Sequence, residues 1–290
     1  MRIWILTKKN LARAGVIALV ALVAVGALYW GGGQAASSVF GTAKKELPVY
    51  SVEQSEKKIA ISFDAAWGDE KTSDILSILD EYQAKCTFFL VGFWVDKYPE
   101  HVKEIDAAGH EIGNHSTNHP HMASLSEGEM QYEIKTTSEK ITALTGKEVK
   151  VFRPPFGEYN DSLIKTCKGM GIQAIQWDVD SLDWKEQGVQ PMVDRVLNNV
   201  KPGSIVLFHN NSKYITEALP TILKNLKDQG YEIVSVSELL LSLIHILLKK
   251  VFKLPALRRA CYSVRKNISF HFRRKKQCVW MEENQISSGR

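Results

Sequence analysis

The feature that most constrains the fold is an alternation of short apolar runs with longer amphipathic stretches, which begins at Lys58 and ends near Leu240. The apolar runs have the composition of strands, and they lie at 59–63, 86–92, 111–116, 151–155, 173–179, 204–210 and 232–237. Stretches with helical periodicity lie between them, at 71–83, 95–109, 126–144, 161–171, 189–200 and 215–230. Strands that alternate with helices predict an α/β fold with a parallel sheet, as a barrel or an open sheet.

The N-terminus has the pattern of an export signal. An uncharged apolar run of 17 residues at 14–30 follows four basic residues, Arg2, Lys8, Lys9 and Arg13. This length is near the minimum for a membrane-spanning helix, and the basic flank is expected to stay in the cytoplasm. We therefore predict a cytoplasmic stub and transmembrane signal anchor at 1–30, with the rest of the chain outside the cell membrane. The protein would be secreted if the signal were cleaved near 35–38.

Composition divides the remaining chain into three parts. Residues 31–57 are predicted to be a linker, 58–241 the main domain, and 242–290 a basic tail. The last 50 residues hold twelve Lys or Arg and two Glu, so the first 240 carry a net charge of −5. An acidic body argues against a nucleic-acid-binding protein. The tail is interpreted as foreign to the domain; the alternative is a basic amphipathic segment on an anionic membrane.

Ionisable side chains follow the ends of most predicted strands. Because the carboxyl ends of parallel strands meet at one edge of the sheet, these side chains are expected to converge there. The set comprises Asp64, His115, His119, Arg153, Asp180, Asp183 and His209. Such a convergence of titratable groups indicates a functional site, although each residue alone has an ordinary structural explanation.

The spacing of His115 and His119 suggests a metal site. Residues four apart on a helical turn share one face, so the two imidazoles would suit one zinc-like ion. Such an ion needs a further ligand, usually a carboxylate, and an open position for water. With a carboxylate base and a histidine acid, the set predicts metal-assisted hydrolysis of an amide or ester.

Five motifs at these strand ends resemble those of a known family. They read FDAAWG (63–68), HSTNH (115–119), FRPPFG (152–157), WDVDSLDW (177–184) and IVLFHN (205–210). In this order they resemble the polysaccharide deacetylases of carbohydrate esterase family four, which remove N-acetyl groups from peptidoglycan or chitin-like sugars. The resemblance spans 58–241 and implies a distorted (β/α)7 barrel. The first and third motifs are most similar to the sporulation-associated and clostridial branch.

The resemblance implies roles for the residues of the first two motifs. The family's first motif reads TFDDG, in which the first aspartate is the base that activates water, and Asp64 matches it. The second aspartate binds the metal, and Ala65 stands at its position. His115 and His119 match the two metal histidines. The implied cofactor is a divalent ion, zinc or cobalt.

The other motifs supply the remaining implied roles. Arg153 matches the arginine that holds the base, and Asp183 matches the acid that orients the catalytic histidine. His209 matches that histidine, which stabilises the tetrahedral intermediate and protonates the leaving amine. The residues that form the groove walls around the sugar and its acetyl group in the family are matched here by Pro155, Phe156, Trp184 and Leu207.

The alanine at position 65 leaves three hypotheses open. Two histidines and water could hold the metal with weaker affinity, or a different carboxylate could substitute, with Asp69, Glu70 and Asp180 as candidates. In the third, the site binds no metal and the chain is a glycan-binding or sporulation protein on the same scaffold.

Because Asp64, Arg153, Asp183 and His209 are all present, the leading hypothesis is an exported enzyme that deacetylates cell-wall or spore-cortex peptidoglycan or an N-acetylglucosamine polymer. A deacetylase of small exported molecules is the weaker enzymatic alternative.

Overall fold

The computed structural model describes residues 45–242, and the account below concerns the compact unit that begins at Leu47. The predicted anchor at 1–30 lies outside the described residues, and so does the basic tail after Ser242. Among the helices of residues 45–242, none is both long and apolar enough to cross a membrane.

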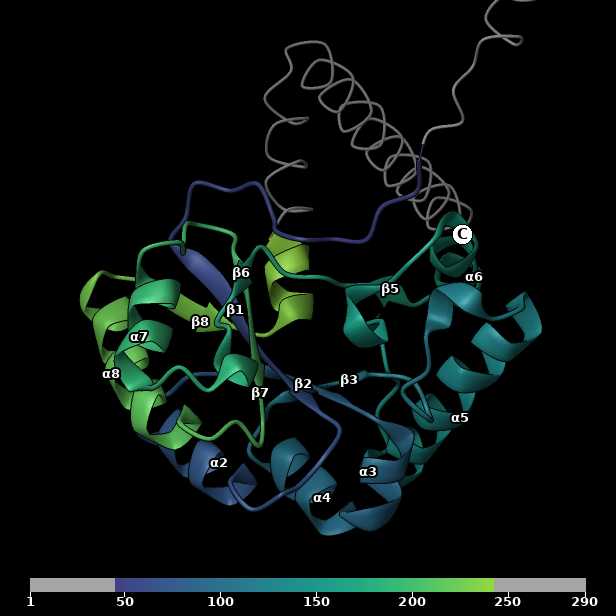
Figure 1. The fold of residues 1–290 in the computed structure, drawn as a ribbon, viewed down its shortest axis with the longest axis horizontal. Coiled ribbons are helices and arrows are strands. Elements are labelled where there is room, and N and C mark those ends of the chain that lie inside the picture. Colours follow the sequence, from purple (N-terminus) through teal and green to yellow (C-terminus); the bar gives the residue numbers. More distant parts are fainter. Residues whose placement is uncertain (1–44, 243–290) are drawn as a thin grey trace, which may run out of the picture. The chain divides into compact units, whose positions relative to one another are not determined.

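One parallel sheet forms the centre of the described unit (Figure 1). Its strands pair in the order β5-β4-β3-β2-β1-β7-β6, and β8 pairs with the beginning of β1. The strands are β1 (Lys58–Ala65), β2 (Thr87–Leu90), β3 (Glu111–Asn114), β4 (Val151–Phe152), β5 (Gln173–Ala174), β6 (Val179–Asp180), β7 (Ile205–His209) and β8 (Glu232–Val234). The prediction of a parallel α/β fold is confirmed.

The sheet differs from the predicted seven-stranded barrel at one place. The predicted strand at 173–179 is two short strands, β5 and β6, which are not paired with each other and form the two ends of the strand order. The chain at 175–178 turns between them, because Gln176 donates its backbone N–H to Val49 (2.7 Å) and Asp178 accepts the N–H of Ile205 (2.9 Å). The sheet is therefore curled but open between β5 and β6.

Part of the predicted linker belongs to this fold. Val49 donates its N–H to Ala174 (3.0 Å) beside β5, and Val52 donates to Gly203 (2.8 Å) before β7. Val52 is almost fully buried. Residues 47–52 therefore cross from β5 to the start of β7, and the compact unit begins about ten residues before the predicted boundary at Lys58.

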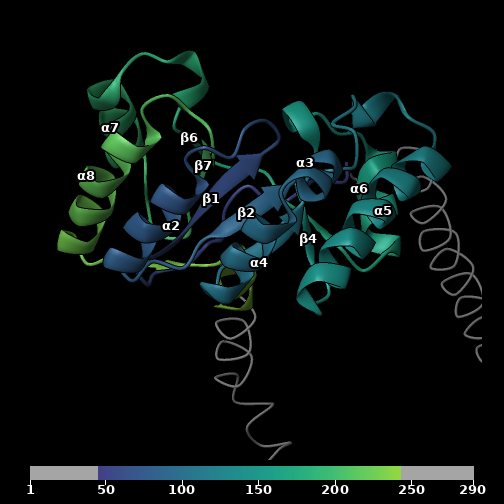
Figure 2. The ribbon, with the colours of Figure 1, turned by 90° about the horizontal axis from the view of Figure 1, so that it is seen from below.

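Helices cover the outer face of the sheet. They are α2 (Thr72–Glu81), α3 (Gly92–Lys97), α4 (Pro99–Ala107), α5 (Glu127–Thr145), α6 (Asp161–Gly169), α7 (Val189–Leu197) and α8 (Ile215–Asp228). Helix α8 packs against α2 and α7, while α5 packs against α3, α4 and α6 (Figure 2). The predicted helix at 95–109 is two helices, because Pro99 cannot continue α3 and instead begins α4.

The apolar core has two main layers, one on each side of the sheet. Between the sheet and the helices, Phe63 stacks on Phe88 and Phe208, with ring centroids 4.9 and 5.7 Å away. Inside the curl, Ala60 packs with Phe89 and neighbouring aliphatic side chains. Since side chains alternate along a strand, β1 presents Ala60, Ser62 and Asp64 to the interior of the curled sheet. Asp64, the last of the three, lies at the open end of this interior.

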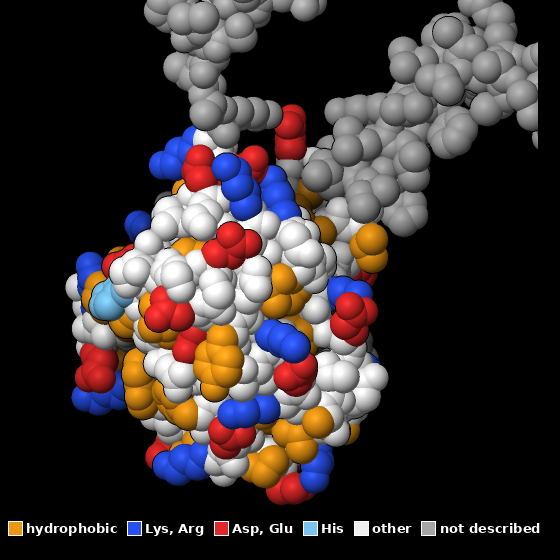
Figure 3. All heavy atoms as spheres, turned by 90° about the vertical axis from the view of Figure 1, so that its right-hand side faces the viewer, with side chains coloured by type: hydrophobic (Ala, Val, Ile, Leu, Met, Phe, Trp, Pro, Cys, Tyr) orange, Lys and Arg blue, Asp and Glu red, His pale blue; other side chains and the backbone are white. Residues whose placement is uncertain are grey.

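The surface drawn in Figure 3 carries basic and acidic side chains side by side and gathers neither sign over a wide area.

The crossing of residues 47–52 generates a stability prediction. A Cβ at Gly203, where φ is +87°, would overlap the carbonyl oxygen of Val52, whereas a Cβ at Gly230, where φ is +82°, would meet no atom within 4 Å. We expect Gly230→Ala to lower the free energy of unfolding by about 1 kcal/mol from backbone strain alone. Gly203→Ala should lower it by roughly 3 kcal/mol, since the segment must also be displaced. Urea unfolding followed by circular dichroism measures the free energy of unfolding of both variants. Equal decreases in the two variants would show that the packing of residues 47–52 against Gly203 contributes no stability.

Candidate active site

A buried ion pair joins β1 to the residue that follows β4. Arg153 is fully buried, and its Nη1 donates to Asp64 Oδ1 at 2.7 Å. Its Nη2 donates to Ser62 Oγ (2.8 Å) and to the carbonyl oxygen of Gln176 (3.2 Å), while its Cζ atom lies 4.2 Å from the centre of the Phe89 ring. Burial, the largest single influence, would raise the pKa of Asp64, but the charge and hydrogen bond of Arg153, together with contributions from His115 and His209, outweigh burial and lower the pKa. Asp64 is therefore a carboxylate at neutral pH.

A second pair forms where β7 ends. His209 Nδ1 donates to Asp183 Oδ1 at 2.8 Å, and the backbone N–H of His209 donates to Asp183 Oδ2 at 2.7 Å. Burial opposes the charged imidazole, yet the hydrogen bond and charge of Asp183, together with the charges of Asp64 and Asp180, outweigh it, so the pKa of His209 is raised. Because Asp183 occupies Nδ1, only Nε2 of His209 remains to exchange a proton with a ligand.

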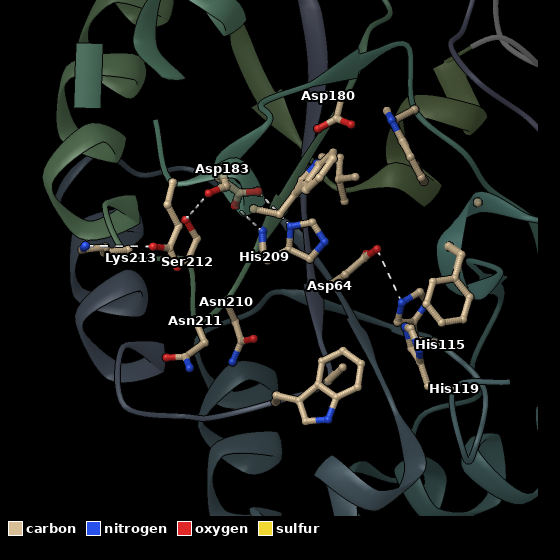
Figure 4. A pocket seen from close by; sticks show the side chains of 18 residues that line it. Asp64, His115, His119, Asp180, Asp183, His209, Asn210, Asn211, Ser212 and Lys213 are labelled. Carbon is tan, nitrogen blue, oxygen red and sulfur yellow. Dashed lines mark hydrogen bonds and ion pairs between the residues drawn. The ribbon is translucent and has the colours of Figure 1, made fainter. Parts of the chain in front are cut away.

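The register of the sheet brings these two pairs together. Asp64 lies directly opposite His209 in the ladder between β1 and β7. Both side chains face the same cavity, with Asp64 between His209 and His115 (Figure 4). The predicted convergence at the strand ends is present.

His115 and His119 lie in a loop after β3 rather than on the predicted helical turn. The loop turns sharply because Ser116 and His119 have positive φ angles, +69° and +55°. The two imidazoles are nevertheless neighbours, with ring centroids 5.0 Å apart and planes at 74°. Their spacing in the sequence correctly predicted that the two histidines are neighbours, although the helical turn on which that prediction rested is absent.

The donor set fits a cation with two imidazole ligands. His115 Nδ1 must donate to the carbonyl oxygen of Arg153 (2.7 Å), and burial lowers the pKa of His115, so Nε2 is an unprotonated acceptor. This Nε2 faces another acceptor, Asp64 Oδ2, at 3.6 Å. Burial also lowers the pKa of His119 to about 4, so its imidazole is neutral as a metal ligand must be. Acceptors that face one another suit a cation or a bridging water between them.

A third protein ligand is not evident in the described part of the chain. The methyl group of Ala65 is buried among apolar side chains and offers no ligand atom. Within residues 45–242, no group of three or more His, Cys, Asp or Glu is arranged to hold a metal.

The three carboxylates considered as substitutes for an aspartate at position 65 differ in location. Asp69 pairs with His101 (3.0 Å), and Glu70 accepts the N–H of Asp69 (3.0 Å), and neither lines the cavity. Asp180 does line it, although its Oδ1 already accepts the N–H of Leu182 at 2.8 Å. Of the three, only Asp180 can reach a ligand in the cavity.

The cavity has a volume of about 620 Å³ and an aromatic rim. Phe156, Trp184 and Leu207 line it as predicted, whereas Pro155 is buried and does not. Sequence reasoning missed Trp67, which is 64% exposed and lies edge-on to His119 at 5.0 Å. Its place three residues after Asp64 was a usable signal. Also missed were Trp177, Glu186, Asn210, Asn211 and Lys213.

Comparisons with known proteins agree with this geometry. Residues 51–175 match the family model for polysaccharide deacetylase. The chain is 40% identical to a peptidoglycan-N-acetylglucosamine deacetylase of Bacillus cereus over 66% of this chain and 92% of the relative. It is 32% identical to the peptidoglycan-N-acetylmuramic acid deacetylase PdaA of Bacillus subtilis, over 70% and 76%. Two other curated relatives are longer, and the chain spans 60% and 40% of their lengths.

One solved structure with an identity in the same range is described as a protein without enzymatic activity. It is a CE4 family pseudoenzyme of Bacillus anthracis, 37% identical, with a TM-score of 0.65 over 67% of this chain and 69% of that one. A mutant of the same protein, described as having restored enzymatic activity, is 38% identical, with a TM-score of 0.65 over 67% of this chain and 71% of that one.

The pairing of His209 with Asp183 generates a pH prediction. In Asp183→Asn the charge that raises the pKa of His209 is lost while burial, which lowers it, remains, so the pKa must fall. NMR titration of the histidine Cε1–H signals measures this, with the His209 signal assigned by its loss in His209→Gln. Asp194→Asn, an exposed change on α7, is the control and should leave the titration in place. An unchanged pKa in Asp183→Asn would contradict the assigned hydrogen bond.

Proposed function

The chain belongs to the polysaccharide deacetylase family, and we propose that it is a metal-dependent hydrolase that removes N-acetyl groups from the amino sugars of peptidoglycan. One observation carries this proposal. A carboxylate with a lowered pKa and an imidazole with a raised pKa face one cavity from directly opposite positions of neighbouring strands. Groups whose environments push their pKa values apart are suited to act as base and acid in one reaction.

Asp64 has the properties of the base. Arg153 occupies Oδ1 and keeps the group ionised, while Oδ2 remains directed toward His115 and the cavity. That oxygen can accept a proton from a water placed between Asp64 and the acetamide carbonyl carbon. Because Arg153 is held by Ser62 and Gln176, the carboxylate keeps its orientation during the proton transfer.

His209 has the properties of the acid. Its raised pKa keeps the imidazolium populated at higher pH than an ordinary histidine, and Asp183 directs Nε2 away from the protein. In hydrolysis, the water oxygen bonds to the carbonyl carbon and the C–N bond breaks. Asp64 takes one proton of the water, the sugar nitrogen takes a proton from His209, and acetic acid leaves with the second water proton and ionises to acetate in solution.

His115 and His119 are the residues that would hold the metal. A bound zinc or cobalt ion would lower the pKa of a ligated water and polarise the carbonyl group. The chain supplies two neutral imidazoles for it, and the ring of His115 is fixed by its hydrogen bond to Arg153.

The proposed substrate is a glycan polymer. Trp67, Phe156 and Trp184 are more than half exposed around the cavity, and exposed aromatic faces are suited to stack on sugar rings. A cavity with three such walls favours a polymer over a small exported molecule. The similar proteins include deacetylases of both N-acetylglucosamine and N-acetylmuramic acid. Export behind an N-terminal anchor and a role in sporulation are part of the proposal, and they rest on the sequence alone.

A glycan-binding protein without catalysis is the second candidate. Ala65 favours it, since position 65 supplies no carboxylate to the metal, and a similar solved structure is described as a pseudoenzyme. The aromatic rim would serve sugar binding in either case.

Acetate release tests the first candidate. The full-length chain, incubated with N-acetylglucosamine oligomers or peptidoglycan and Zn²⁺ or Co²⁺, should release acetate. Asp64→Asn should lower the rate by about 10² to 10⁴-fold, as expected for loss of a general base. Asp69→Asn, which changes a carboxylate outside the cavity, should retain the rate.

Circular dichroism is needed in parallel, because Asp64→Asn leaves Arg153 buried without its partner. A wild-type chain that binds the oligomers but releases no acetate would support the glycan-binding protein instead.

Restoring the family's aspartate tests how the metal is held. We expect Ala65→Asp to tighten Co²⁺ binding at least about tenfold in a spectroscopic titration, since a carboxylate adds a third ligand. Without metal, the same change should lower thermal stability, because position 65 is buried among apolar side chains. Asp180→Asn is the companion variant and should leave Co²⁺ affinity unchanged. If Asp180→Asn weakens binding and Ala65→Asp has no effect, Asp180 is already the third ligand.

A further inference from the structure

One buried carboxylate has no part in the chemistry described above. Within residues 45–242, the buried carboxylates are Asp64, Asp183 and Glu133. The first two belong to the proposed base and acid pairs. Glu133 lies on α5, is 6% exposed, and does not line the cavity. A buried carboxylate needs compensating hydrogen bonds, and the partners that Glu133 takes indicate its role.

All the hydrogen-bond donors found around Glu133 come from the segment between the two proposed metal histidines. Oε2 accepts the backbone N–H groups of Thr117 and Asn118, both at 2.8 Å, and Oε1 accepts from Asn118 Nδ2 at 2.6 Å. One side chain therefore holds two consecutive peptide groups that lie between His115 and His119.

The rest of the contact with α5 holds the residues before this segment. Asn114 Nδ2 donates to the carbonyl oxygen of Ile134 (2.6 Å) and to Ser138 Oγ (2.9 Å), and Thr137 Oγ1 donates to the carbonyl oxygen of Ser116 (3.0 Å). Helix α5 itself is fixed at its start by a capping box between Ser126 and Glu129. The helix is thus a firm support for the loop.

The loop needs such a support because its backbone is unfavourable by itself. Ser116 and His119 both have positive φ angles without being glycine, and such residues persist only where their surroundings hold them. If the two peptide groups between them were released, the loop could relax and the two imidazoles would separate from their present centroid distance of 5.0 Å.

We propose that Glu133 is a positioning residue, which fixes the loop from His115 to His119 and thereby sets the distance between the two imidazoles. The consequence for metal binding rests on the proposed function, whereas the effect on the loop does not. With only two protein ligands evident in the described residues, the geometry of the histidine pair determines metal affinity more than it would in a site with three.

Two variants of the full-length chain separate the loss of the hydrogen-bond acceptor at position 133 from the loss of its negative charge. Glu133→Met has a similar length but accepts no hydrogen bond, so both backbone N–H groups lose their partner. Glu133→Gln keeps one oxygen for these groups, and the amide of Asn118 can turn to pair with the new NH₂ group. We expect the loop at 114–121 to exchange amide hydrogens at least tenfold faster in Glu133→Met, and Co²⁺ to bind at least tenfold more weakly. Glu133→Gln should restore most of both properties.

Ser138→Ala is the matched control. It removes a partly buried hydrogen bond between the same helix and Asn114, but it leaves Thr117 and Asn118 in place. Its exchange at 114–121 and its Co²⁺ affinity should equal those of the wild type. If Glu133→Met does not fold, Asn118→Asp decides the question, because Asn118 is exposed and a carboxylate there would repel Glu133 and speed exchange of the loop.

The measurements distinguish the two proposals. Unchanged loop exchange in Glu133→Met, or equal changes in Ser138→Ala, would overturn the role of Glu133. A wild-type chain that binds no Co²⁺ would contradict the proposed metal dependence, and loop exchange alone would then decide the role of Glu133. Faster exchange with unchanged Co²⁺ affinity would overturn the inference that Glu133 sets the imidazole distance.

Discussion

The backbone ladder between β1 and its neighbours is the constraint on which the site depends. β1 pairs with β2, β7 and β8, and seven of its eight residues are buried. This places Asp64 at a fixed height in the sheet, opposite His209 on one side and Phe89 on the other. Because parallel strands lie about 4.8 Å apart, main-chain hydrogen bonds set the spacing of the proposed base and acid before any side chain contributes. Arg153 and Asp183 then adjust the charge of these groups.

The sequence was sufficient to predict the parts of the site that follow from strand ends. Asp64, Asp183 and His209 converge on one cavity, and Arg153 reaches Asp64 beside it, because parallel strands end at one edge, which alternating patterns reveal. The proximity of His115 and His119 was predicted from their spacing, but their loop conformation was not, because it depends on positive φ angles and on contacts with a helix later in the chain.

Other features could not be predicted, for different physical reasons. The run at 173–179 divides into β5 and β6 because Val49 and Ile205 capture its backbone groups, and such long-range partners leave no trace in a local pattern. Glu133 resembles any acidic residue of a helix surface until the fold places it against Thr117. The roles of the individual site residues stay predictions, although their positions are now known.

Because Arg153 and Asp64 form a buried ion pair, finding both residues in a relative does not by itself show that the relative is an active enzyme. Loss of either partner would leave an uncompensated charge in the interior, which typically destabilises a protein by about 3–5 kcal/mol. Selection for folding alone can therefore preserve both residues in a descendant that has stopped performing chemistry. His119 is different, because it is only partly buried, lies outside that ion pair, and contacts the aromatic rings of Trp67 and Phe156 at the cavity rim. Among relatives of this chain, substitution at the position of His119 should therefore mark the loss of activity more faithfully than substitution at the position of Asp64.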